Sequence, residues 1–72
     1  MYVIKLKGRK VSVDGVKMFF SYEDARLALR RKIRQMIRQG KATKDDFGMF
    51  DEVSRGPTDY TGYGFNIVNV LS

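Results

Sequence analysis

Two turn signals within the first twenty residues divide the start of the chain into three short segments. The first is Gly8-Arg9, whose leading glycine fits a type II′ hairpin turn, and the second is Asp14-Gly15, which fits a type I′ turn. The segments around them alternate apolar and polar residues, a pattern typical of strands with one buried face. Because such turns join neighbouring strands, we predict a three-stranded antiparallel meander over residues 2–20.

The two turns also predict a strand register, which can be checked against the side-chain pattern. Val16 is expected opposite Val13, and Leu6 opposite Val11. One face then collects apolar residues: Tyr2, Ile4, Leu6, Val11, Val13, Val16, Met18 and Phe20. The other face holds Val3, Lys5, Lys7, Lys10, Ser12, Lys17 and Phe19. A slip of one residue would mix the two sets, so their separation supports the meander.

A single helix is predicted to follow, beginning at Ser21 and ending near Gly40. The hydroxyl of Ser21 suits the N-cap, and Glu23 and Asp24 suit the positive end of the helix dipole. Glycine suits the position just after a helix because it adopts positive φ without strain. A spacing of 3.6 residues per turn gives an apolar stripe, which we expect to pack on the apolar sheet face. The stripe comprises Tyr22, Ala25, Leu29, Ile33 and Met36, with Ile37 at its edge.

The opposite side of the predicted helix is basic, and its charge has one sign. Its residues are Arg30, Arg31, Arg34, Arg38 and Lys41, with Leu27 among them. No acidic residue occurs between Ala25 and Lys44, and the net charge of the chain is +6. Like charges spaced by four on a helix face repel one another. The pattern favours nucleic acid, an acidic host protein or a nucleoprotein complex as partner; the alternative is a solvated face that keeps the protein soluble.

Residues beyond the helix give weaker signals. We expect a strand over residues 48–54, with a short helix as the alternative, then a turn over 55–59 and a strand over 60–71. The predicted fold is α+β in the order βββαββ: a three-stranded antiparallel meander, one amphipathic helix packed on it, and a C-terminal β-hairpin. Residues 1–72 form a single domain at this length. The hairpin either extends the first sheet or covers its lysine face.

Two further sets of residues are candidates for binding. Lys5, Lys7, Lys10 and Lys17 share the polar sheet face. An exposed sheet face can enter the major groove of DNA, although exposed lysines also protect sheet edges from aggregation. Tyr60 and Tyr63 can stack on bases or anchor a protein interface, although aromatic residues in strands are also common in cores.

Cysteine and histidine are absent from the chain. Their absence excludes a disulfide framework, a Cys/His zinc site and a Ser-His-Asp triad. The carboxylate pairs Asp45-Asp46 and Asp51-Glu52 have no accompanying ligands, so we interpret them as surface charge. We therefore expect no enzymatic activity, no metal site and no cofactor. No apolar run is long enough to span a membrane, and a cytoplasmic location fits the composition.

The run Phe20-Ser21-Tyr22-Glu23-Asp24-Ala25 resembles the F-x-T/S-x-E-E/D-A entry to the helix in two DNA-binding families. These are the arm-binding domains of phage integrases and the plant ethylene-response factors, which combine a three-stranded sheet with a helix. The resemblance covers about half the chain, from Tyr2 to about Ile37. It implies that the sheet face with Lys5, Lys7, Lys10 and Lys17 enters the major groove. In size and composition the chain is also similar to small phage-encoded inhibitors such as anti-CRISPR proteins.

Three functional hypotheses follow. The first is a non-enzymatic nucleic-acid-binding accessory protein, encoded by a phage or mobile element, whose helix arginines contact phosphates. The second is a phage-encoded, anti-CRISPR-like inhibitor that binds a host protein or nucleoprotein complex through the same basic face. The third is a structural subunit that oligomerises through the tyrosine-rich hairpin. Acidic residues of the C-terminal half that neutralise the arginines would remove the argument for a polyanionic ligand.

Overall fold

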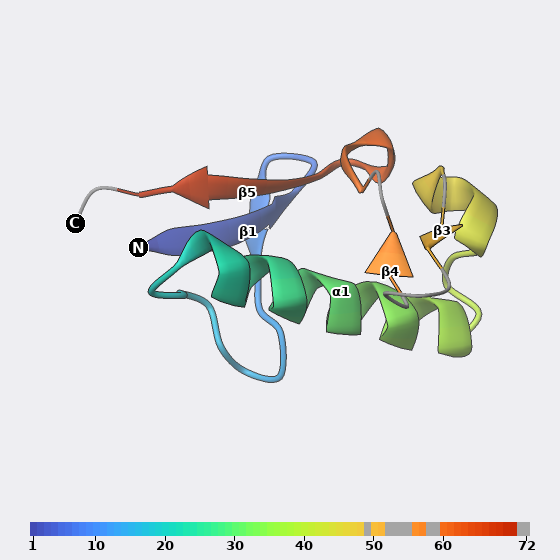
Figure 1. The fold of residues 1–72 in the computed structure, drawn as a ribbon, viewed down its shortest axis with the longest axis horizontal. Helices are drawn as coiled ribbons and strands as arrows, with labels where there is room; N and C mark the ends of the chain where they lie inside the picture. Colours follow the sequence, from blue (N-terminus) through green and yellow to red (C-terminus); the bar gives the residue numbers. More distant parts are fainter. Residues whose placement is uncertain (49, 52–55, 58–59, 71–72) are drawn as a thin grey trace.

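A computed structural model describes residues 1–48, 50–51, 56–57 and 60–70. As predicted, it is an α+β fold with a three-stranded antiparallel sheet and one long helix, which lies along one face of the sheet (Figure 1). In chain order the elements are β1 (Tyr2–Leu6), β2 (Arg9–Val11), α1 (Tyr22–Arg38), the 3₁₀ helix η1 (Lys44–Phe47), β3 (Phe50–Asp51), β4 (Gly56–Pro57), the 3₁₀ helix η2 (Thr61–Tyr63) and β5 (Phe65–Asn69).

The third strand of the sheet comes from the C-terminal part of the chain. The strand order is β2-β1-β5, and β5 runs antiparallel along the whole of β1, with Ile67 opposite Ile4. The last predicted strand thus extends the first sheet. The C-terminal hairpin is confirmed only in part: β3 pairs with β4 in a separate two-stranded sheet, whereas β5 pairs with β1. Residues 49, 52–55, 58–59 and 71–72, on which part of that prediction falls, lie outside the described residues.

Residues 16–20 do not form the third strand of a meander, which corrects the sequence-based prediction. The Asp14-Gly15 turn forms as expected, with φ of 51° and 83°. Beyond β2, however, only two isolated bridges follow, one across this turn and one between Phe19 and Tyr2. Two backbone hydrogen bonds of 2.8 Å join Phe19 directly to Tyr2. The chain therefore returns to β1 itself, and residues 12–18, here called the arm, leave the sheet and pass beside the helix (Figure 1).

The four apolar residues among 16–20 have the reverse of the burial that the alternation predicts. Phe19 was placed on the polar face but is only 8% exposed. Val16, Met18 and Phe20 were placed in the core, yet they are 46%, 45% and 86% exposed. Because the residue that bridges to β1 is Phe19, its side chain joins the core and that of its neighbour does not.

The turn between β1 and β2 lies one residue earlier than predicted. Lys7 and Gly8 form its centre with φ of 52° and 85°, so both are positive, as in a type I′ turn rather than type II′. Ile4 therefore pairs with Val11. This register differs from the prediction by two residues, and an even shift leaves the same side chains on each face. The amide of Lys7 also donates to the carbonyl oxygen of Gly64 at 2.9 Å, a long-range contact that the local pattern does not reveal.

Both predicted ends of the helix are confirmed. The hydroxyl of Ser21 accepts a hydrogen bond from the amide of Asp24 at 3.1 Å, which satisfies one free donor of the first turn. At the other end Gly40 has a φ of 75°, and its amide donates to the carbonyl oxygen of Ile37 at 3.1 Å. The amide of Lys41 donates to the carbonyl oxygen of Met36 at 2.9 Å. Together these two hydrogen bonds form a Schellman motif, in which the helix ends.

The core lies between α1 and the sheet and continues under η1. Most of the predicted helix stripe packs there, but Tyr22 is 46% exposed and Ala28, which was not predicted, is fully buried. Phe47 of η1 is also fully buried, with its ring 4.8 Å from that of Tyr63 and 6.4 Å from that of Phe65. The buried residues of the core are Ile4, Val13, Phe19, Ala25, Ala28, Leu29, Ile33, Ala42, Phe47 and Phe65.

Candidate functional site

The outer side of α1 carries the basic residues that point farthest from the sheet. Arg34 follows the fully buried Ala25 by nine residues, which is two and a half helical turns, so it lies on the opposite side of the helix. Arg31 lies about one turn before Arg34 and Arg38 about one turn after it; both are exposed, while Arg34 is half-buried. Leu27, on the same side, is 41% exposed. We call Arg31, Arg34 and Arg38 the outer arginines.

Two further residues predicted for the basic helix face, Lys41 and Arg30, do not belong to the outer arginines. Lys41 is exposed just beyond the end of the helix. Arg30 is half-buried on the helix flank, four residues after Arg26. Arg26 binds both carboxylate oxygens of Glu23, with 3.0 Å between Nε and Oε2. This hydrogen-bonded partner, with a further contribution from the charge of Arg30, lowers the pKa of Glu23. The flank thus holds a tight pair of opposite charges.

Carboxylates near the outer arginines are few and weakly bound. The side chain of Asp14, at the tip of the arm, lies 3.9 Å from Nε of Arg31, and both side chains are more than half exposed. Gln35 also donates to Asp14, at 3.4 Å. Within the part of the chain that the structure describes, no carboxylate forms an ion pair with Arg34 or Arg38. Exposed ion pairs are worth at most about 1 kcal/mol, so the Asp14 contact leaves Arg31 open to other anions.

The four candidate lysines do not form one surface. Lys5 and Lys10 are direct partners on β1 and β2, on the sheet face opposite to Ile4 and therefore away from α1. Lys7 lies in the turn, with its ammonium 5.9 Å from the centre of the Tyr63 ring. Lys17 belongs to the arm, which has left the sheet. The sheet lysines and the outer arginines face opposite directions, so one rigid ligand cannot contact both.

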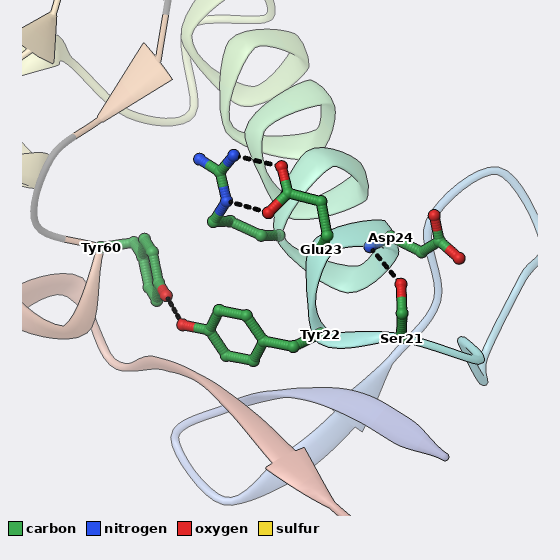
Figure 2. A network of polar contacts seen from close by, with 6 residues as sticks. Ser21, Tyr22, Glu23, Asp24 and Tyr60 are labelled. Atoms are coloured by element: carbon green, nitrogen blue, oxygen red, sulfur yellow. Dashed lines mark hydrogen bonds and ion pairs between the residues drawn. The ribbon is translucent and has the colours of Figure 1, made fainter.

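The two candidate tyrosines make contacts within the chain. Tyr60 and Tyr22 share a hydrogen bond of 2.8 Å between their hydroxyl groups beside the Arg26–Glu23 pair (Figure 2). Partial burial, reinforced by this bond, raises the pKa of Tyr60 to about 12. Tyr63 is half-buried and stacks on Phe65 at 5.6 Å. These contacts account for both side chains as parts of the fold.

A pocket between the arm and α1 was not predicted from the sequence. Its volume is about 370 Å³, and its lining residues are Val16, Met18, Phe19, Phe20, Asp24, Leu27 and Arg31. Three of the apolar lining residues, Val16, Met18 and Phe20, are ones that the predicted meander would have buried. The one local sequence signal for this pocket is Leu27, an apolar residue among the arginines of the helix. Arg31 therefore belongs both to the outer arginines and to the rim of the pocket.

Of the two carboxylate pairs, only Asp45-Asp46 lies wholly within the described residues. Asp45 and Asp46 are exposed in η1, and Asp46 accepts the amide of Thr43 at 2.8 Å. Glu52 lies outside the described residues. The described residues hold no cluster of three or more histidine, cysteine, aspartate or glutamate side chains suited to a metal ion.

No described helix has the length and apolar character needed to cross a membrane.

Comparisons with known proteins give no guide to function. No family model matches the sequence, and neither the curated proteins nor the solved structures contain a detectable match.

Proposed function

We propose that the chain is a non-enzymatic nucleic-acid-binding accessory protein that contacts phosphates through the outer arginines. The observation that supports this most directly is the arrangement of Arg34 and Arg38. Both lie on the side of α1 away from the core, and no described carboxylate pairs with either of them. Guanidinium groups in such a position can exchange water and counterions for phosphate oxygens.

The spacing of the outer arginines suits a polyanion. From Arg31 to Arg38 the helix rises about 10 Å, at 1.5 Å per residue. Duplex DNA carries about one charge per 1.7 Å of axis, so about six phosphates occupy that length. Because this count covers both strands, about three of these phosphates belong to each strand, which matches the outer arginines in number. A phage or mobile-element source is part of the proposal, and it rests on the resemblance of the helix entry to phage integrase arm-binding domains.

This binding mode differs from the one that the family resemblance implies. There the exposed sheet face enters the major groove, which would use Lys5 and Lys10. Only these two candidate lysines share the sheet face here, and they lie directly opposite each other on neighbouring strands. The helix offers three cations on one continuous side, so we assign phosphate contact to α1 and not to the sheet.

The test is binding of a short labelled duplex and a single strand of the same length at low salt. We expect the wild-type chain to bind, and Arg34→Glu/Arg38→Glu to lose most of the affinity because charge repulsion replaces attraction. Lys5→Glu/Lys10→Glu is the matched control: it makes the same change in net charge on the opposite side and should retain substantially more binding. Absence of wild-type binding, or an equal loss in both variants, would contradict the proposal.

A protein partner is the second candidate function, in the manner of an anti-CRISPR-like inhibitor of a host protein or nucleoprotein complex. One observation favours it: the pocket between the arm and α1 exposes apolar side chains beside Arg31. Phosphate binding gives no use for these side chains, whereas protein interfaces combine apolar centres with arginine.

A further inference from the structure

The apolar side chains around the pocket are exposed and lie close together. Phe20 is 86% exposed, and Val16, Met18 and Leu27 are each more than 40% exposed. They come from two separate segments, the arm with the residues after it and the helix, and line one pocket. Single exposed apolar residues are ordinary, but several gathered at one concave place mark a surface that is covered in use.

We propose that this pocket docks an acidic segment of a partner protein, which inserts one apolar side chain between the arm and α1. The inference deepens the second candidate function and rests on it. In the docked state an aliphatic or aromatic side chain of the partner contacts Met18, Phe20 and Leu27, and a carboxylate beside it binds Arg31. Burial of apolar groups supplies the attraction, and the ion pair fixes the orientation of the segment.

The charges at the pocket itself are balanced, and the excess positive charge that favours an acidic partner lies beside it, along the helix. Arg31 forms part of the wall, and Lys17 is exposed on the arm between Val16 and Met18. Two carboxylates offset these positive charges: Asp24 lines the pocket, and Asp14 lies 3.9 Å from Arg31. The Asp14 contact is long and solvent-exposed, so a better-placed carboxylate of a partner can replace it. Beyond Arg31 the helix continues with Arg34 and Arg38, which extend the positive surface.

The same charges disfavour a second copy of this chain as the occupant. Two copies that met at this pocket would bring their Arg31 side chains together, and each carries a net charge of +6. Nucleic acid is disfavoured by the chemistry of the apolar wall. Val16, Met18 and Leu27 are aliphatic and offer no ring on which a base can stack, which leaves Phe20 as the one exposed aromatic residue of the pocket.

The test uses the full chain as bait for a displayed library of random peptides, in parallel with the variant Met18→Ser/Leu27→Ser. Both substitutions are at exposed positions, and circular dichroism and thermal unfolding would show that the fold is retained. We expect peptides that bind the wild type to carry an apolar residue next to aspartate or glutamate. Their affinity should fall roughly tenfold or more on the double variant and also on Arg31→Gln. Basic peptides, an unchanged affinity on these variants, or no enriched peptide would overturn the proposal.

Two controls separate this proposal from the alternatives. Met18→Ser/Leu27→Ser should bind the labelled duplex as tightly as the wild type, because neither residue is charged. Duplex binding and peptide binding are thus measured separately, and either proposal can fail while the other holds. Loss of single-strand binding in Phe20→Ala would instead assign the pocket to bases. Sedimentation that showed a wild-type dimer, dissociated by the double variant, would instead assign it to a second copy of the chain.

Discussion

Replacing Phe47 with alanine should remove a large part of the stability of the domain, although this residue lies in a 3₁₀ helix outside the sheet and α1. Its side chain is fully buried and packs against the rings of Tyr63 and Phe65. Truncation of a buried phenylalanine to alanine costs about 3–5 kcal/mol, because the removed ring leaves a cavity that neighbours fill incompletely. A domain of 72 residues has a total stability of about 4–11 kcal/mol at usual values per residue.

Phe20→Ala is the matched comparison, since it makes the same chemical change at a side chain that is 86% exposed. Here the expected change in the free energy of unfolding lies within about 0.5 kcal/mol of zero. The assay is urea unfolding followed by far-ultraviolet circular dichroism, with the midpoint and the slope fitted for each variant. Similar losses in the two variants, or a larger loss for Phe20→Ala, would refute the placement of these two phenylalanines and the departure of the arm from the sheet.

Three smaller perturbations test local features of the fold. Ser21→Ala removes the hydroxyl that accepts the Asp24 amide, and the free energy of unfolding should fall by about 1 kcal/mol, measured by urea unfolding; Ser21→Asp should restore most of it. Gly40→Ala places a β-carbon at a φ of 75°, so thermal unfolding should show a loss of about 1 kcal/mol, caused by backbone conformation alone since the space is open. Absorbance titration of the tyrosines should show one of them ionising at about pH 12, and Tyr60→Phe should abolish that late step. Because the folded pKa of Tyr60 is raised above its ordinary value of 10.0, its contribution to stability is present below pH 10 and disappears as the pH rises towards 12.

The helix was predictable because its determinants are local. The cap at Ser21, the glycine at Gly40 and the apolar spacing between them all act within a few residues. Both ends are found as expected, and most of the apolar stripe is buried. The position of the outer arginines follows from the same periodicity, since the side chains opposite a buried stripe must face solvent. The Asp14-Gly15 turn is likewise set by two residues that accept positive φ.

The course of the arm and the pairing of β5 could not be predicted, because they depend on contacts between distant residues. Two residues of the third strand, Ile67 and Phe65, face β1 partners more than fifty positions earlier, and no local pattern reveals which strand will occupy that edge. The alternation of residues 16–20 was consistent with a strand, but the direct bridge from Phe19 to Tyr2 competes with that pairing. The pocket follows from this departure, so the sequence pattern, which placed Met18 in the core, concealed it.

The salt dependence of duplex affinity tests the central proposal, phosphate contact by the outer arginines, most directly. Each phosphate contact contributes about 0.9 to the slope of log affinity against log salt concentration. Arg34→Gln/Arg38→Gln removes two such contacts, so its slope should be shallower than that of the wild type by about 1.8. Lys5→Gln/Lys10→Gln, on the sheet face away from α1, should leave the slope unchanged. Equal slopes for the wild type and the arginine variant, or an equal change in the lysine variant, would contradict phosphate binding by this helix.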